Sequence, residues 1–223
     1  MNIVITGISS SIGLELIKNF DKKNNLIWGQ YYKSSPEAIL REIKNTENFN
    51  LFSVDFCKYD ELKNFSDTIF NSEKKIDVLI HLPSAKLEIR QFEKISWASF
   101  EHQILIQVRS LHVLISRLKK RIAQKNNAKI IVCGSEVTEG SIPAGMIDYV
   151  TTKGMLKYYC ESLKKELQDK NVTIHYISPG MFRSKLLSNL PNYIIEKYCS
   201  DIEGDPIHKD ILPLILSYIY RTN

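Results

Sequence analysis

The chain has 223 residues, of which 43% are hydrophobic and 25% are charged. This length and composition favour one globular domain with one core, and they exclude collagen-like, disordered and disulfide-scaffold proteins. The formal net charge is only +5, and the lysines are spread along the chain, so the sequence argues against a dedicated arm for binding nucleic acid.

Cysteine use and hydropathy indicate a reduced, cytoplasmic protein with no membrane segment. The four cysteines are Cys57, Cys133, Cys160 and Cys199. They show neither CxxC spacing nor a Cys/His cluster, so we expect free thiols and no metal site. The longest near-apolar stretch, Ile211–Tyr220, is about half of the roughly 20 residues that span a bilayer, and no secretory signal pattern follows Met1.

Short β-branched runs alternate with longer segments in which apolar residues recur at helical spacing. The runs predicted to be strands are Asn2–Ile5, Leu26–Tyr32, Leu51–Val54, Val78–Leu82, Lys129–Cys133 and Thr173–Ile177. The clearest helical patterns cover Ile12–Phe20, Phe100–Ile122 and Tyr149–Leu167. The alternation predicts an α/β fold: a doubly wound Rossmann-type parallel sheet of order 3-2-1-4-5-6, helices on both faces, in one domain over residues 1–223. A less regular segment at about 182–206 is predicted to form a small flap.

The first strand leads into Thr6-Gly7-Ile8-Ser9-Ser10-Ser11-Ile12-Gly13 and then an amphipathic helix. A dinucleotide site needs a tight turn here, because the pyrophosphate lies against the helix N-terminus. Gly7 suits the turn and Gly13 suits close helix–strand packing. Ser9, Ser10, Ser11 and Ile12 offer hydroxyl and backbone N–H groups to phosphate. For this segment alone, a serine-capped helix after a strand remains the alternative.

Tyr149 and Lys153 place a phenol and an ammonium on one helical face. The ammonium favours phenolate, which moves the phenol pKa toward the range of general acid–base catalysis. The same spacing recurs at Tyr59/Lys63 and Tyr193/Lys197, so spacing alone decides nothing. Only Tyr149 follows, fourteen residues later, a serine at the end of a predicted strand. Ser135 would therefore lie at the sheet edge where ligands bind, and its hydroxyl can hold a carbonyl oxygen.

In collinear order, TGISSSIG, Ser135, the YVTTK segment and Ser178-Pro179-Gly180-Met181-Phe182-Arg183-Ser184 resemble the short-chain dehydrogenase/reductase family, with the general layout of its 3-oxoacyl-thioester reductases. The resemblance implies that Ser135, Tyr149 and Lys153 are catalytic. It also places Gln107 where the family has an asparagine whose backbone carbonyl holds a water that passes protons to the lysine.

The resemblance also implies the cofactor contacts. Pro179, Gly180, Phe182 and Ser184 match the segment that holds the nicotinamide, and Asp55 matches the aspartate that accepts from the adenine amino group. No carboxylate ends the second strand, whereas Lys33 stands there, so we expect NADP(H) to be preferred over NAD(H). The alternative is that Lys33 is a solvated turn lysine.

Four departures from the family pattern touch function. Ser11 replaces the usual middle glycine, Gln107 replaces the asparagine, and His81-Leu82-Pro83-Ser84 replaces NNAG. We expect His81 to be a packed, hydrogen-bonded histidine rather than an acid or a ligand. The seventh strand of the family is missing, which favours a homodimer over a tetramer and leaves a hetero-oligomer open. Interface candidates on the two long helices are Val108, Leu111, Tyr158 and Ser162.

The leading hypothesis is an NADPH-dependent ketoreductase that transfers a hydride to a substrate carbonyl. A 3-oxoacyl thioester on an acyl carrier protein is one candidate substrate, since Lys125 and Lys170 fall where such reductases carry basic residues. The alternative is that both lysines are ordinary surface charges with no role in docking. The alternative function is a catalytically impaired family member that serves as a cofactor-binding partner subunit or a redox-sensing module. An epimerase or dehydratase is disfavoured, because those members carry a larger substrate domain.

Overall fold

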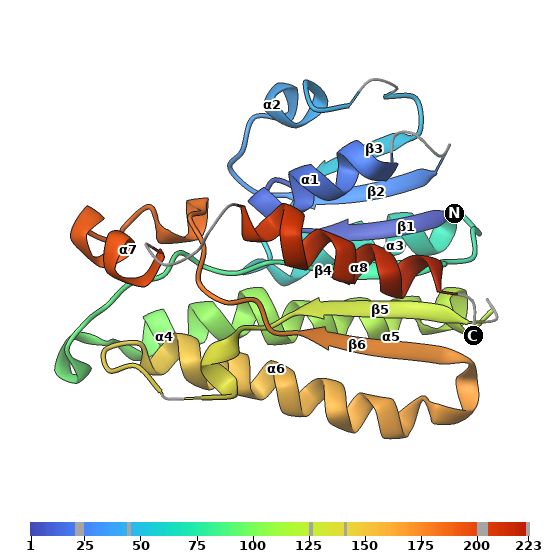
Figure 1. Ribbon diagram of the computed structural model, residues 1–223. Helices are drawn as coiled ribbons and strands as arrows, with labels where there is room; N and C mark the ends of the chain where they lie inside the picture. The colour runs from blue at the N-terminus through green and yellow to red at the C-terminus, as the bar shows by residue number, and fades with distance from the viewer. Residues whose placement is uncertain (21–24, 44–45, 125–126, 141, 200–204, 222–223) are drawn as a thin grey trace.

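The computed structural model describes residues 1–20, 25–43, 46–124, 127–140, 142–199 and 205–221. Its strands are β1 (Asn2–Thr6), β2 (Leu26–Tyr31), β3 (Phe49–Ser53), β4 (Val78–His81), β5 (Ala128–Cys133) and β6 (Val172–Ile177). They form one parallel sheet in the order β3-β2-β1-β4-β5-β6, which confirms the predicted doubly wound Rossmann-type fold (Figure 1). The near-continuous apolar runs of the central strands reflect burial on both faces.

Helices cover both faces of the sheet (Figure 1). They are α1 (Ser11–Phe20), α2 (Pro36–Leu40), α3 (Tyr59–Asn71), α4 (Trp97–Ile104), α5 (Ser110–Ala123), α6 (Ile147–Glu166), α7 (Asn192–Cys199) and α8 (Leu212–Tyr220). Buried side chains of α3, α5 and α6 form one apolar layer against the sheet, and those of α1 and α8 form the second. A third cluster, which includes Leu87, Met146 and Leu187, lies beside the flap.

The helix predicted over Phe100–Ile122 is interrupted. A π-helical turn, Leu105–Arg109, separates α4 from α5. The apolar stripe continues through this turn, so side-chain periodicity gave no sign of it. A π turn widens the backbone locally and changes which carbonyls have helical partners, and such turns are frequent at functional sites.

Helix α8 is held to the sheet by polar groups as well as apolar packing. The Lys129 ammonium, on β5, donates to the backbone oxygens of Ile219 and Arg221 at 3.1 and 2.7 Å, where the last carbonyls of a helix lack partners. The rings of His175 and Tyr218 stack with centroids 3.9 Å apart. These contacts fix α8 across the sheet.

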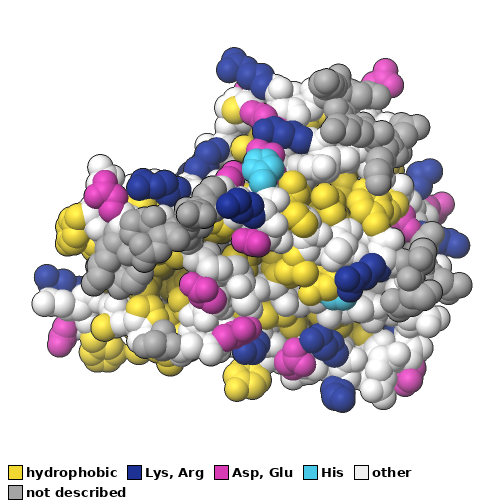
Figure 2. All heavy atoms as spheres, in the orientation of Figure 1, with side chains coloured by type: hydrophobic (Ala, Val, Ile, Leu, Met, Phe, Trp, Pro, Cys, Tyr) yellow, Lys and Arg dark blue, Asp and Glu magenta, His cyan; other side chains and the backbone are white. Residues whose placement is uncertain are grey.

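Figure 2 shows acidic and basic side chains interspersed over the face that carries α1 and α8. In the part of the chain that the structure describes, no helix has the length and apolar character that a bilayer-crossing segment requires. The predicted flap comprises a short 3₁₀ turn, Lys185–Leu187, and α7; residues 200–204 of that prediction lie outside the described residues.

Candidate active site

A cleft of about 960 Å³ opens at the carboxyl ends of the strands, where ligands bind in open α/β sheets. Its volume lies near the upper end of the roughly 300–1,000 Å³ typical of small-molecule sites. The β1–α1 turn and the end of β2 line one part of it. The ends of β4 and β5, the start of α6 and the flap line the other.

The β1–α1 turn is built to approach a ligand closely. Gly7 has φ +70°, a left-handed conformation that favours glycine, and its N–H donates to Gln30 Oε1 at 2.9 Å. Ser10 caps α1, because its Oγ accepts from the backbone N–H of Gly13 at 3.1 Å. The N–H groups of Ser11 and Ile12 then remain in the first turn without helical acceptors.

Gly13 does not line the cleft and instead has a packing role. A Cβ on Gly13 would lie 2.4 Å from the backbone oxygen of Ile8, so only glycine lets the helix approach the turn this closely. Ser9, Ser10, Ser11 and Ile12 all line the cleft.

Lys33 and Asp55 line the cleft beside this turn. Lys33 also has a left-handed backbone, with φ +57°, and its ammonium lies 4.9 Å from the centre of the Tyr32 ring. Burial alone would raise the pKa of Asp55. Hydrogen bonds from the Cys57 N–H, at 2.9 Å, and from Tyr32 outweigh it and hold the pKa of that carboxyl below its usual value.

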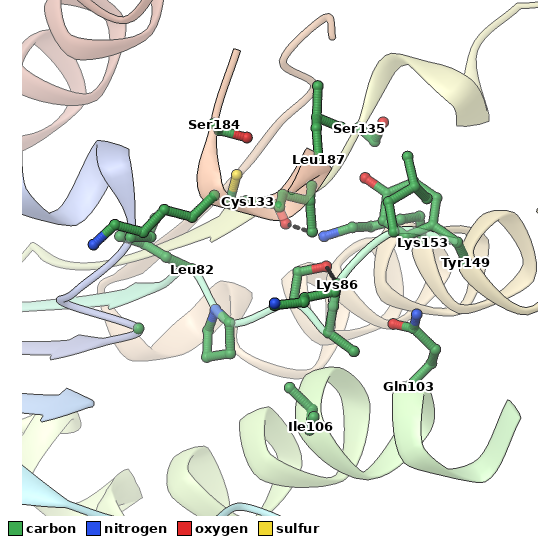
Figure 3. Close-up of a pocket in the computed structure, with 18 of the residues that line it drawn as sticks. Leu82, Lys86, Gln103, Ile106, Cys133, Ser135, Tyr149, Lys153, Ser184 and Leu187 are labelled. Carbon is green, nitrogen blue, oxygen red and sulfur yellow. Dashed lines mark hydrogen bonds between the residues drawn. The ribbon is translucent and has the colours of Figure 1, made fainter. Parts of the chain in front are cut away.

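Ser135, Tyr149 and Lys153 gather in the other part of the cleft (Figure 3). All three are buried, with exposed fractions of 7%, 6% and 2%. Ser135 follows β5, and the other two lie one turn apart on α6. Tyr59 and Tyr193, which begin the other two YxxxK repeats, are exposed and are not among the described residues that line the cleft.

Burial dominates the protonation of the tyrosine and the lysine. It raises the pKa of Tyr149 to about 12, while a hydrogen bond with Ser135 acts in the opposite direction. The Lys153 ammonium donates to the backbone oxygen of Cys133 at 3.0 Å and lies 5.6 Å from the centre of the Tyr149 ring. Burial lowers the pKa of Lys153. In this arrangement Tyr149 is therefore a neutral phenol near neutral pH.

Gln107 does not reach the cleft that these three residues line. Gln107 is fully buried in the π turn and is not one of the described residues that line the cleft. Its backbone oxygen, which the resemblance implied would hold a water, lies 2.9 Å from His81 Nε2. Sequence comparison cannot find this contact, because it requires both the π turn and the histidine that replaces the family's usual residue.

His81 is packed and hydrogen-bonded, as expected. Its Nδ1 lies 2.8 Å from Thr6 Oγ1, and burial lowers its pKa to about 3. The neutral ring must donate from Nε2, since a carbonyl only accepts. Nδ1 then accepts from the Thr6 hydroxyl.

The segment after β6 lies beside the part of the cleft that Ser135 and Tyr149 line. Pro179, Gly180, Phe182 and Ser184 all line it. The Glu136 N–H donates to the oxygen of Pro179 at 3.1 Å, which ties this segment to the loop that carries Ser135. The Leu87 N–H donates to the oxygen of Leu186 at 3.0 Å and ties the flap to the loop after β4.

The polar residues that line the cleft without having been predicted from the sequence include Gln30, Lys86 and Gln103. Gln30 is buried in β2 and bridges two loops, because its Oε1 accepts from Gly7 and its Nε2 donates to the oxygen of Val54. A polar residue inside an apolar strand was the available signal. Lys86 and Gln103 carried no comparable signal.

Comparisons with known proteins agree with this architecture. Residues 1–193 match the family model described as short chain dehydrogenase. A 3-oxoacyl-(acyl-carrier-protein) reductase of Buchnera aphidicola is 24% identical over 200 residues, which cover 89% of this chain and 80% of that protein.

Solved structures resemble the fold at lower identity. A dehydrogenase/reductase from Sinorhizobium meliloti superposes with a TM-score of 0.83 at 17% identity, over 98% of this chain and 87% of that one. A 3-ketoacyl-(acyl-carrier-protein) reductase from Brucella melitensis, complexed with NADH, gives 0.74 at 16% identity, over 86% and 80%. The family match spans most of the sequence and the sheet order is the expected one. The chain therefore belongs to the short-chain dehydrogenase family.

Proposed function

We propose that this protein is an NADPH-dependent ketoreductase with Ser135, Tyr149 and Lys153 as its catalytic residues. One observation carries the proposal: these three residues converge in the same cleft as a glycine- and serine-rich turn at a helix N-terminus. A phosphate-binding turn and a proton donor in one cleft suit reduction of a carbonyl by a dinucleotide.

The residues present fit a nicotinamide dinucleotide. The free N–H groups of Ser11 and Ile12, together with the hydroxyls of Ser9 and Ser10, would hold the pyrophosphate. Asp55 would accept from the adenine, and Pro179, Gly180, Phe182 and Ser184 would hold the nicotinamide. The reduced nicotinamide, when bound, supplies the hydride for the substrate carbonyl carbon.

The chain's own residues hold the proton and donate it to the substrate. With a pKa of about 12, the Tyr149 hydroxyl holds its proton at neutral pH and can donate it to the substrate oxygen. The Ser135 hydroxyl donates a hydrogen bond to the same oxygen and stabilises its developing charge. The buried Lys153 ammonium stabilises the phenolate that remains after the proton has moved.

The preference for NADPH rests on Lys33. This ammonium lines the cleft beside the end of β2, and residues 31–35 contain no carboxylate that would favour an unphosphorylated ribose. The competing hypothesis is NADH, the cofactor present in the Brucella structure.

A 3-oxoacyl thioester is the proposed substrate class, supported by the acyl-carrier-protein reductases among the relatives. Lys125 and Lys170, the two lysines predicted to contact an acyl carrier protein, lend little support to a carrier-bound substrate. Lys170 lies in a short 3₁₀ turn just before β6, at the amino end of the strands and therefore away from the cleft. Lys125 lies outside the described residues. The exposed lysines that line the cleft itself are Lys33, Lys86 and Lys185.

We further propose a homodimer in which α5 and α6 pack against their copies. Tyr158 has an exposed fraction of 75%, and Ser162 is exposed on the same helix. Leu111, in contrast, is fully buried against the sheet, so it is not available for the contact predicted for it. The cytoplasmic location remains a prediction from the sequence.

A paired test separates the reductase from the cofactor-binding alternative, which the departures from the family pattern at Ser11 and Gln107 favour. The purified protein is titrated with NADPH and NADH by fluorescence and then assayed with activated ketones and acetoacetyl thioesters. In Tyr149→Phe we expect turnover to fall about 100- to 10,000-fold, the range for loss of a general acid. Tyr59→Phe, in the exposed repeat, is the matched control and should retain activity. Binding without turnover, or equal rates for the parent and Tyr149→Phe, would favour the partner-subunit or redox-sensing role.

A further inference from the structure

Gln103 is a buried amide in the wall of the catalytic part of the cleft. It lies on α4 with an exposed fraction of 4%. Figure 3 shows its amide end directed from α4 into the cavity that Tyr149 and Ser135 also face. The chemistry described above for reducing a ketone does not use this side chain.

The orientation of this amide is fixed by a hydrogen bond from Gln107. Gln107 Nε2 donates to Gln103 Oε1 at 2.7 Å. Gln107 is itself anchored, because its backbone oxygen accepts from the neutral ring of His81. With Oε1 engaged, the Gln103 amide turns its NH₂ group toward the cleft.

No described residue accepts a hydrogen bond from that NH₂ group. Among the described residues, the buried side-chain atoms that lack a partner include Gln107 Oε1 but not Gln103 Nε2, so the NH₂ group of Gln103 remains accessible from the cleft. An amide NH₂ in that position can donate to an oxygen that enters the cleft. The cavity that Gln103 faces is the one that receives the substrate. A ligand oxygen is therefore the partner that this geometry supplies.

We propose that Gln103 determines substrate specificity by donating from Nε2 to a second acceptor oxygen of the substrate, beside the ketone that Tyr149 and Ser135 hold. The substrate class is then a ketone with a neighbouring carbonyl or carboxylate oxygen: an oxo ester, an oxo thioester or an oxo acid. Gln107 is a positioning residue for this contact. The inference rests on the proposed reductase function and narrows its substrates.

The test compares ketones that differ in the second oxygen. Ethyl acetoacetate and 2-heptanone have chains of equal length, but only the first carries a second carbonyl oxygen. For Gln103→Met, which is close to isosteric, we expect kcat/KM for ethyl acetoacetate to fall about 3- to 10-fold, the range of one neutral hydrogen bond. The effect should appear mainly in KM, and the value for 2-heptanone should stay within twofold. Acetoacetate serves as a third substrate: a larger loss for it than for the ester identifies a carboxylate as the second oxygen, and a smaller loss identifies an ester-type carbonyl.

A second variant tests whether Gln103→Met acts through the substrate contact or through a destabilised fold. Gln103→Met leaves the Gln107 amide without its partner, so the double variant Gln103→Met/Gln107→Met removes both amides. It should show the same loss of discrimination between ester and plain ketone. Gln107→Met alone should give a smaller loss, since Gln103 is kept but no longer held. Equal losses for both ketones, or no change in their ratio, would overturn the role of Gln103 and leave the reductase standing. Absence of turnover with all three ketones in the parent protein would overturn both proposals.

Discussion

His81 Nε2 lies 2.9 Å from the backbone oxygen of Gln107, so a strand-end histidine holds the π turn between α4 and α5. The other ring nitrogen of His81 contacts Thr6 Oγ1 on β1. One neutral imidazole thus joins β1, β4 and the helix that carries Gln103.

The protonation of His81 should make the protein unstable in acid. Its pKa in the folded state is about 3, against about 6.5 in the unfolded chain, so the unfolded state binds the extra proton between those values. The stabilisation is complete above about pH 6.5 and is lost as the pH falls toward 3. Between pH 7 and 4.5 we expect His81 to account for a loss of about 2 to 3 kcal/mol in the free energy of unfolding.

Urea denaturation of the parent and of His81→Asn at both pH values measures this term. The variant should be less stable at pH 7 but should lose correspondingly less on acidification, because the titrating ring is gone. Identical losses in the two proteins would assign the acid sensitivity to other groups, such as the half-buried His175, whose pKa burial lowers to about 4.

Tyr149 should remain protonated in the cofactor-free protein far above neutral pH. Burial raises its pKa to about 12 and the Ser135 hydrogen bond offsets only part of that shift. The tyrosinate absorbance of the parent and of Tyr149→Phe should therefore be the same up to about pH 11. A difference that titrates between pH 7 and 9 would show instead that Lys153 already favours the phenolate before cofactor binds.

Lys33 should discriminate between the two dinucleotides. If its ammonium pairs with a 2′-phosphate, Lys33→Ala should weaken NADPH binding about 10- to 100-fold, which corresponds to a charged hydrogen bond of about 1.5–3 kcal/mol. NADH binding should change less than threefold. Lys58→Ala is the matched control, since that exposed lysine pairs with Glu61. Equal weakening of both cofactors would place the 2′-phosphate elsewhere.

Two helical glycines should respond in opposite directions to alanine. In Gly13→Ala the new Cβ would lie 2.4 Å from the backbone oxygen of Ile8, and we expect a loss of about 1–3 kcal/mol or more. In Gly154→Ala, on α6, no atom lies within 4 Å of the new Cβ, so helix propensity should add up to about 1 kcal/mol. Urea midpoints measure both changes. Comparable stabilities for the two variants would mean that α1 shifts away from the turn without cost.

The sequence was sufficient to predict the sheet order and to predict that Ser135, Tyr149 and Lys153 lie in one cleft. A strand that is buried on both faces appears in the sequence as a local apolar run. Because right-handed crossovers leave few topologies, the six runs were enough to predict the order β3-β2-β1-β4-β5-β6. Ser135, Tyr149 and Lys153 were found because strand ends meet at one sheet edge, which makes sequence position a guide to proximity.

Only the tertiary structure showed the π turn and the long-range hydrogen bonds around those residues. The π turn leaves the apolar stripe of the long helix intact, so the displaced carbonyl of Gln107 could not be read from periodicity. The contact from His81, the amide pair of Gln103 and Gln107, and the Lys129 ammonium at the end of α8 each join groups far apart in the chain. Apolar burial repeats with the period of a helix or a strand, whereas a hydrogen bond between distant residues has no period. Only the folded backbone determines which donor meets which acceptor.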